Sequence, residues 1–158
     1  MTALIPVVVA GALGRMGAEV IRAVQGAEDC TLVGAIDNTP GKEGCDVGLE
    51  LGLGELEVAV TADFEGCLCA VSQSVRAAEA GAVLVDFTHP SVVYDHTRAS
   101  IAYGVHPVIG TTGLSPQQLD DLTQFSAKAS IGGAVIPNFS VGMVLLQQAA
   151  AAAARFYD

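Results

Sequence analysis

The sequence predicts an α/β protein built on a doubly wound parallel sheet, and three observations support this prediction. The apolar pattern switches repeatedly between continuous β-branched runs and segments with helical spacing, which is typical of βαβ units. Glycine is frequent, at 18 of 158 residues, and it interrupts the apolar runs. Apolar residues make up 51% of the chain and charged residues 15%, a composition that excludes intrinsic disorder. A chain of this length holds one ordinary core, with room for only a very small second unit.

The first half of the chain begins with a strand, a helix and a second strand. The run from Leu4 to Ala10 suits a strand covered on both faces, and Gly11 ends it. Apolar residues with helical spacing follow at Met16, Val20, Ile21 and Val24. Thr31 to Ile36 is predicted as the second strand, and the glycine-rich, acidic stretch from Asn38 to Gly54 as a loop. The remaining segments are predicted as short strands over Glu57 to Thr61 and Phe64 to Ala70, and a short helix over Ser72 to Ala80.

The second half alternates between strands and helices more clearly. Its strands are predicted over Val83 to Phe87, Val105 to Ile109 and Ala134 to Ile136. Pro90 marks the start and Gly104 the end of the helix between the first two of them. Ser140 is placed to cap a last helix that continues through the alanines to about Arg155.

The helix between the last two strands has a specific start signal. Ser115, Pro116 and Gln118 supply an N-cap, a first-turn proline and a capping-box partner in the expected order. Leu119 and Leu122 then fall on the predicted inner face of this helix.

A glycine motif lies between the first strand and the first helix. In a dinucleotide-binding turn, Gly11 would make the tight turn, Gly14 would let the backbone approach a pyrophosphate, and Gly17 would let the helix pack on the strand. The helix N-terminus offers free N–H groups to an anion, and Arg15 adds a charge. This context predicts a Rossmann-like dinucleotide site. The spacing is G-x-x-G-x-x-G rather than the commoner G-x-G-x-x-G, so a purely structural glycine turn is the alternative.

Asp37 supports the dinucleotide interpretation. It ends the second strand about twenty residues beyond the motif, where an acid accepts hydrogen bonds from an adenosine ribose. An acid at this position favours NAD over NADP, because it repels a 2′-phosphate. Asn38 and Lys42 weaken that preference, since Lys42 is able to swing toward a phosphate, although a solvated loop lysine is the simpler interpretation. An ordinary acidic loop residue is the alternative for Asp37.

Three later segments lie where strands of such a sheet end, at Asp86 to Pro90, Gly110 to Gly113 and Ile136 to Ser140. Ligands of doubly wound sheets bind outside the carboxyl ends of the strands, so we expect these segments to form one rim. Hydroxyl and backbone donors at Gly110 to Gly113 suit a nicotinamide or an anionic substrate, and Phe87 or Phe139 suits a flat ring. Strand-end turn chemistry is the alternative for each. Of the three histidines, only His89 is expected near the rim, in a structural or capping role.

Charge and composition exclude several classes of protein. With 7 basic and 17 acidic residues, the net charge of -10 repels a nucleic-acid backbone, so an anion must be held locally. No apolar run reaches membrane-spanning length, and the N-terminal stretch lacks the basic flank of a signal peptide, which predicts a soluble cytoplasmic protein. The four cysteines are expected to be reduced and inert, with the C-x-C pair as a weak metal or redox alternative, at Cys30, Cys45, Cys67 and Cys69. No metal site is predicted.

Taken together, five ordered motifs resemble the N-terminal part of the 4-hydroxy-tetrahydrodipicolinate reductase family, also called dihydrodipicolinate reductase. These motifs are V-A-G-A-L-G-R-M-G, A-I-D-N, V-D-F-T-H-P, V-I-G-T-T-G-L and I-P-N-F-S-V-G. The resemblance implies reduction of 4-hydroxy-tetrahydrodipicolinate to tetrahydrodipicolinate with NADH or NADPH, in lysine and diaminopimelate biosynthesis. It places Thr112 near the substrate, a cyclic dicarboxylate. It implies cofactor contacts at Gly11, Ala12, Leu13, Gly14, Arg15, Met16, Asp37, Gly110, Thr111, Thr112, Ile136, Pro137, Asn138 and Phe139.

The chain departs from the family pattern at its C-terminal end. The family's second domain carries a His-His-x-x-Lys element that supplies the proton donor, and no such element occurs in this sequence, so no catalytic residue is predicted here. We therefore expect a Rossmann domain over 1–137 and, over 138–158, the first helix of a truncated substrate and oligomerisation domain. The resemblance implies a homotetramer for the longer protein and leaves a monomer open for this shorter form. The alternatives are a stand-alone NAD(P)H-binding module or partner subunit, and another nicotinamide enzyme such as a homoserine dehydrogenase.

Overall fold

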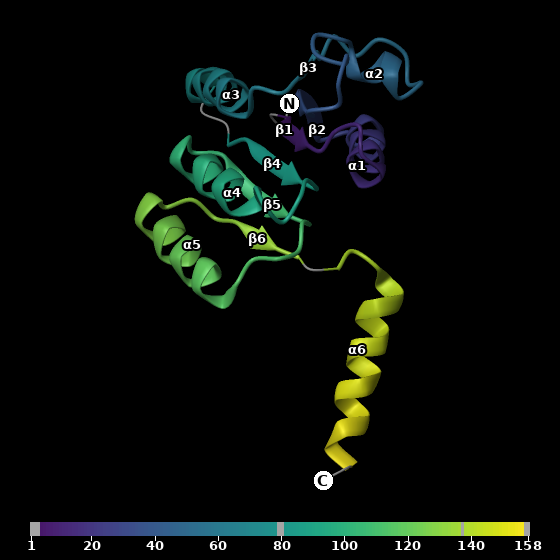
Figure 1. The fold of residues 1–158 in the computed structure, drawn as a ribbon, viewed down its shortest axis with the longest axis vertical. Helices are drawn as coiled ribbons and strands as arrows, with labels where there is room; N and C mark the ends of the chain where they lie inside the picture. The colour runs from purple at the N-terminus through teal and green to yellow at the C-terminus, as the bar shows by residue number, and fades with distance from the viewer. Residues whose placement is uncertain (1–3, 79–80, 137, 157–158) are drawn as a thin grey trace.

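A six-stranded parallel sheet forms the centre of the protein in a computed structural model that describes residues 4–78, 81–136 and 138–156 (Figure 1). The strands are β1 (Ile5–Ala10), β2 (Cys30–Ile36), β3 (Val60–Thr61), β4 (Val83–Asp86), β5 (His106–Ile109) and β6 (Ala134–Val135). Their order is β3-β2-β1-β4-β5-β6, and every neighbouring pair is parallel. The chain therefore crosses over in opposite directions on the two sides of β1. This order confirms the doubly wound prediction and creates a crevice between the ends of β1 and β4.

Helices cover both faces of this sheet. They are α1 (Arg15–Gly26), α2 (Val47–Glu50), α3 (Phe64–Ala78), α4 (Val93–Ala102), α5 (Pro116–Ala129) and α6 (Val141–Ala153), followed by a 3-10 turn, η1 (Ala154–Phe156). Alternate residues of β1 face opposite layers, with Val9 packed among residues of α1 and α2, and Val8 among residues of α3 and β4. Both valines are fully buried, and each contributes roughly 1.5–3 kcal/mol of hydrophobic stabilisation. Burial on both faces explains why the sequence of β1 is continuously apolar.

The strand predicted over Phe64 to Ala70 is wrong, because this segment is the first half of α3. The Asp63 side chain accepts a hydrogen bond from the backbone N–H of Gly66 at 2.9 Å, which satisfies a free donor of the first turn. Leu68, Val71 and Val75 then recur at helical spacing and are buried against the sheet. The separately predicted helix from Ser72 is the continuation of the same element.

The prediction that Asn38 to Gly54 is all loop is wrong at one place, because the segment contains a single helical turn, α2. The carboxylate of Asp46 caps this turn by accepting a hydrogen bond from the N–H of Leu49 at 3.0 Å. It also accepts from the N–H of Leu56, at 3.1 Å for the shorter of two contacts, and from the N–H of Val58 at 3.2 Å. One side chain therefore ties the turn to the segment that leads into β3. The strand β3 covers only Val60–Thr61 and is shorter than the predicted strand over Glu57 to Thr61.

The predicted cap is present at the start of α5 and only partly formed at the start of α6. Ser115 and Gln118 form both bonds of the predicted capping box at the start of α5. Leu122 is buried on the inner side of α5, whereas Leu119 lies at its margin and is 37% exposed. Ser140 occupies the N-cap position of α6, but its side chain makes no capping hydrogen bond.

Helix α6 extends away from the sheet (Figure 1). It carries no charged residue, and none of its residues is buried. Val141, Leu145 and Leu146 are 74%, 59% and 60% exposed. Within the described residues, this helix thus presents uncovered apolar side chains. No helix among them is long and apolar enough to cross a membrane.

We expect Gly17→Ala to destabilise the fold, because a Cβ at this position would collide with the carbonyl oxygen of Gly11. Overpacking of this kind costs about 1–3 kcal/mol in the free energy of unfolding, measured by urea denaturation. Gly26→Ala is the matched control at the other end of α1, where a Cβ meets nothing within 4 Å. Equal stability of the two variants would contradict the close packing of α1 on the glycine loop.

Candidate functional site

Two clefts lie side by side at the carboxyl edge of the sheet, and Gly14, Phe87 and Thr88 line both of them. The first, which we call the Asp37 cleft, has a volume of about 600 Å³. Its lining residues are Gly11, Gly14, Ile36, Asp37, Asn38, Ala62, Phe64, Phe87, Thr88, His89, Ser91, Val92 and His96. The second, the Thr112 cleft, has a volume of about 320 Å³. It is lined by Gly14, Arg15, Met16, Phe87, Thr88, Pro90, Gly110, Thr111 and Thr112.

The glycine loop closes on the end of β2 before α1 begins. The N–H groups of Gly11 and Ala12 both donate to the carbonyl oxygen of Ile36, at 2.8 Å and 3.1 Å. Gly11 has a φ of 77°, and a Cβ there would lie 2.6 Å from the carbonyl oxygen of Phe87, so this position requires glycine. The first amides of the loop are therefore used within the fold.

The N–H groups open to a ligand belong to the first turn of α1. In an α-helix the first N–H groups have no intrahelical acceptor, and here these begin with Arg15 and Met16. Gly14 is the N-cap residue and provides no side-chain oxygen for them. Its φ of -71° does not require glycine, and a Cβ would meet only the Gly11 carbonyl oxygen, at 3.1 Å. Gly14 therefore leaves space beside a helix N-terminus whose partial positive charge favours an anion.

The carboxylate of Asp37 is held by two neighbouring segments. One oxygen accepts a hydrogen bond from the N–H of Leu13 in the glycine loop at 2.9 Å. The other accepts from the N–H and the hydroxyl of Thr39, at 2.9 Å and 2.6 Å. Asp37 is partly buried and lines the Asp37 cleft, so its remaining acceptor position is available to a hydroxyl donor of a ligand.

Asp86 is a fully buried carboxylate at the end of β4. It accepts hydrogen bonds from the Thr88 N–H and hydroxyl at 2.9 Å and 2.7 Å, from the Thr111 hydroxyl at 2.8 Å, and from Nδ1 of His96 at 3.0 Å. Burial alone would raise the pKa of Asp86, but the bonds from His96, Thr88 and Thr111 outweigh it and hold the pKa below its usual value. Asp86 is therefore ionised at neutral pH and joins three segments of the rim.

The expectation that only His89 lies near the rim is wrong, because His96 lines the same cleft. The ring of His96 stacks on Phe64, with centroids 3.9 Å apart and planes 9° apart. A carboxylate only accepts, so the bond to Asp86 places the proton of the imidazole on Nδ1. Position 96 lies one helical turn after Val92, which also lines this cleft. This four-residue spacing could have predicted from the sequence that His96 lies near the rim.

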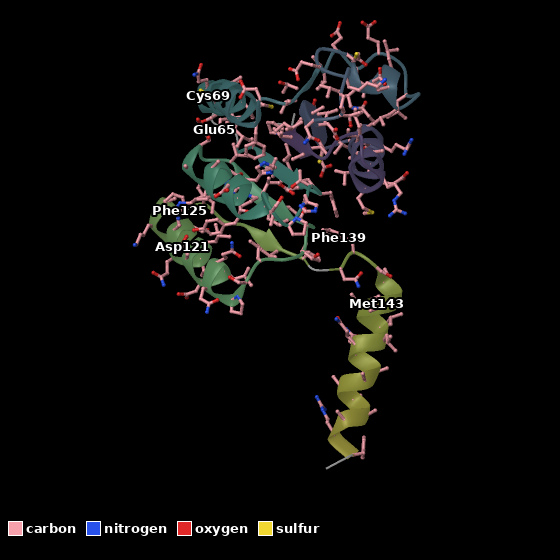
Figure 2. The ribbon with its side chains drawn as sticks, viewed as in Figure 1. Glu65, Cys69, Asp121, Phe125, Phe139 and Met143 are labelled. Carbon is pink, nitrogen blue, oxygen red and sulfur yellow. The ribbon has the colours of Figure 1, made fainter. Side chains whose placement is uncertain are left out.

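Phe87 lines both clefts, and its ring contacts a second aromatic ring. A Cβ at Gly110 would collide with the ring of Phe87, so this glycine makes room for the ring beside the end of β5. The rings of Phe87 and Phe139 are 5.2 Å apart and tilted by 56°. Phe139 comes from the segment between β6 and α6 (Figure 2) and is 47% exposed.

Most of the predicted cofactor residues lie at these clefts, with some exceptions. The side chain of Ala12 is fully buried and that of Leu13 packs on the core, so neither side chain lines a cleft. Ile136 donates its N–H to the carbonyl oxygen of Ile109 beside β6, and the Asn138 side chain accepts from the N–H of Ser140 just before α6. These two residues and Phe139 do not line either cleft. Pro137 lies outside the described residues. As ligand contacts, all of these positions remain predictions.

The four cysteines form no disulfide with one another in the structure. All four are free thiols, at Cys30, Cys45, Cys67 and Cys69. Burial raises the pKa of Cys67, which disfavours the reactive thiolate. In the described part of the chain, no group of three or more potential ligands could hold a metal ion.

Comparison with known proteins identifies the family. The family model described as "Dihydrodipicolinate reductase, N-terminus" matches residues 5–139. The chain belongs to this family. It is 90% identical over 158 residues to the 4-hydroxy-tetrahydrodipicolinate reductases of Synechococcus sp. (strain CC9605) and Parasynechococcus marenigrum (strain WH8102). The match covers 100% of this chain and 57% of each relative, so the chain spans little more than half the length of these family members.

Solved structures agree with this assignment. A dipicolinate-bound dihydrodipicolinate reductase from Paenisporosarcina sp. TG-14 is similar with a TM-score of 0.70 and 30% identity, over 96% of this chain and 54% of that one. The WlbA dehydrogenase from Thermus thermophilus, solved with NAD and alpha-ketoglutarate, has a TM-score of 0.68 at 15% identity, over 84% of this chain and 41% of that one. The second likeness shows a shared fold only.

We expect Asp86→Asn to lower the free energy of unfolding at pH 7 by about 2 kcal/mol, because the charge-assisted bonds are lost. The folded-state pKa of Asp86 is depressed, so its stabilisation is present above the unfolded value of about 3.9 and is lost as the pH falls through the folded value. The stability gap between the wild type and the variant should therefore narrow below about pH 4.

Urea denaturation at pH 7, 5, 4 and 3 measures this gap. Asp95→Asn, which alters an exposed carboxylate on α4, is the control and should differ little from the wild type at any pH. A gap that stays constant across the series would show that the Asp86 charge does not stabilise the fold.

Proposed function

We propose that this chain binds NADH or NADPH across the two clefts and forms the cofactor domain of a 4-hydroxy-tetrahydrodipicolinate reductase. The observation that carries this proposal is the position of the α1 N-terminus beside Asp37 at the crevice between β1 and β4. A dinucleotide has an anionic centre and a ribose with two hydroxyls on one side. The free N–H groups of α1 suit the first, and the Asp37 carboxylate suits the second.

The second cleft suits the nicotinamide end of the cofactor. When bound, the cofactor supplies a hydride to the substrate. The residues of this chain would bind and orient the ring, with the Thr111 and Thr112 segment on one side and the Phe87 and Phe139 rings beside it. Thr112 is exposed at this cleft and is the residue we propose to lie near the substrate.

For a full-length protein of the size of these family members, we propose the reduction of 4-hydroxy-tetrahydrodipicolinate to tetrahydrodipicolinate. This reaction belongs to lysine and diaminopimelate biosynthesis. The proton donor and the groups that bind the cyclic dicarboxylate would come from the part of those proteins that this chain does not span. We propose residues 1–137 as the cofactor domain and 138–158 as the start of a second domain. The exposed apolar surface of α6 supports this division, because such a surface needs a cover. A cytoplasmic homotetramer is proposed for the longer protein.

Gly14→Ala is expected to weaken NADH binding by about tenfold, equivalent to about 1.4 kcal/mol, because the added methyl group occupies the space beside the first-turn N–H groups. Titration followed by NADH fluorescence measures the dissociation constant, and thermal unfolding checks that the fold is retained. Gly26→Ala is the control and should bind as the wild type does. Unchanged affinity in Gly14→Ala would contradict the proposed position of the pyrophosphate.

The 158-residue chain is expected to bind NADH without turnover. Joining it to the remaining part of the Synechococcus sp. (strain CC9605) relative should restore reduction of 4-hydroxy-tetrahydrodipicolinate, followed by the loss of NADH absorbance. Turnover by the 158-residue chain alone would contradict the proposed division of labour. Binding without turnover in both forms would instead favour a stand-alone binding module.

A further inference from the structure

Resting on the proposed function, we propose that His89 and His96 recognise the purine base of the dinucleotide and select adenine over a 6-oxo purine. With the ribose at Asp37 and the pyrophosphate at the N-terminus of α1, the base falls to the remaining part of the Asp37 cleft. Phe64 and Val92 line that part with apolar surface, which suits a flat base. The two imidazole rings line it as well and supply nitrogen atoms for the polar edge of the base.

The bond to Asp86 makes His96 a hydrogen-bond acceptor toward the cleft. Nδ1 of His96 donates to a carboxylate oxygen of Asp86 at 3.0 Å, so the neutral ring has a free lone pair on Nε2. Among the described residues, no hydrogen bond uses this Nε2, and no side-chain nitrogen or oxygen is both buried and without a partner. Nε2 is therefore accessible, on a side chain that lines the cleft and is 19% exposed. The stacked ring of Phe64 holds the imidazole in its plane.

The hydrogen bonds of His89 give this ring the opposite tautomer. The Ser91 N–H donates to Nδ1 of His89 at 3.2 Å, and a backbone N–H accepts nothing in return. The Ser91 hydroxyl lies 2.9 Å from the same nitrogen. Nδ1 is thus the acceptor of the neutral ring, and the proton lies on Nε2. His89 is exposed at the cleft, so its Nε2 presents a donor where His96 presents an acceptor.

An acceptor and a donor together match the edge of adenine. Adenine has an amino group at position 6, which donates, beside a ring nitrogen, which accepts. The amino group would donate to Nε2 of His96, and the ring nitrogen would accept from Nε2 of His89. Hypoxanthine has a carbonyl oxygen in place of the amino group, so two acceptors would face each other at His96. A site that loses a hydrogen bond in this way rejects the analogue.

Isothermal titration of the 158-residue chain with NADH and with reduced nicotinamide hypoxanthine dinucleotide tests the proposal. The two ligands have the same pyrophosphate, riboses and nicotinamide, and differ only in the purine. Ordinary histidines change charge between about pH 5 and 8, so the titrations are made at about pH 8.5. We expect NADH to bind about tenfold more tightly.

Asp86→Asn is expected to reverse the tautomer of His96. One oxygen of Asp86 accepts from the N–H of Thr88, which can only donate, and the other oxygen accepts from His96. The amide oxygen of the variant must therefore stay toward Thr88, and the amide nitrogen faces His96 and donates to its Nδ1. The proton of His96 then lies on Nε2, which becomes a donor. We expect the hypoxanthine dinucleotide to bind this variant at least as tightly as NADH does.

His96→Asn separates base recognition from the structural role of the ring. Its amide still reaches Asp86 as a donor, but it places no group where Nε2 lies, so the two dinucleotides should bind about equally. His106→Asn is the matched control, because its ring bonds to the carbonyl oxygen of Gly132, outside both clefts, and it should leave the preference unchanged. Thermal unfolding of each variant confirms that the fold is retained.

NMR chemical shifts of the imidazole nitrogens give a second measurement, which needs no ligand. We expect the proton of His96 on Nδ1 and that of His89 on Nε2 in the wild type. In Asp86→Asn, the proton of His96 should move to Nε2. A proton on Nε2 of His96 in the wild type would overturn the assigned acceptor.

The outcomes separate this inference from the proposed function. Equal binding of the two dinucleotides by the wild type would overturn the base selectivity and leave the dinucleotide site standing. A preference for NADH that is unchanged in Asp86→Asn and His96→Asn would overturn His96 as its cause. We expect His89→Ala to weaken NADH binding several-fold, and unchanged affinity would overturn the role of His89. Failure of both dinucleotides to bind would overturn the proposed function itself.

Discussion

The buried carboxylate of Asp86 is the interaction on which the rest of the rim depends. An ionised group inside a protein loses several kcal/mol of hydration, so it is tolerated only where hydrogen bonds replace the lost water. Here the donors come from Thr88, Thr111 and His96, on three different segments. The Asp86 carbonyl oxygen also accepts from the N–H of Gly110, which fixes the end of β5. Because these segments are held by one buried charge, the shape of both clefts is set by the core and not by loose loops.

A second constraint is the close approach of α1 to the end of β1. Gly11 and Gly17 are required by that approach, since a side chain at either position would collide with backbone. Gly14 has no such requirement from φ and lies at the surface between the two clefts. The fold thus requires two of the three glycines, whereas at Gly14 a Cβ would meet only one backbone oxygen, at 3.1 Å, and its absence leaves room for a ligand at the helix N-terminus. This separation favours a binding motif over a purely structural turn.

How far the sequence predicts the protein depends on whether a signal is local. The β1 run, the glycine motif and the Ser115 capping box are local, and each lies where it was predicted. The turn at α2 depends on Asp46 accepting from backbone ten and twelve residues further along the chain, which no local pattern contains. His96 is likewise held at the rim by contacts with other elements, because its ring stacks on Phe64 and its Nδ1 donates a hydrogen bond to Asp86. Propensity and period describe single segments, whereas these contacts form between segments.

The position of individual charges explains how an acidic protein can favour a dinucleotide. Charges separated by more than about 8 Å are largely screened at physiological ionic strength, so the net charge of -10 acts weakly on a ligand already at the rim. Nearby groups dominate instead. The first turn of α1 and Arg15 are positive toward the Thr112 cleft, and Asp37 is negative toward the other. A ligand with an anionic centre and a hydroxyl-bearing end matches this order of charges, because the helix N-terminus attracts the first and the Asp37 carboxylate accepts from the second.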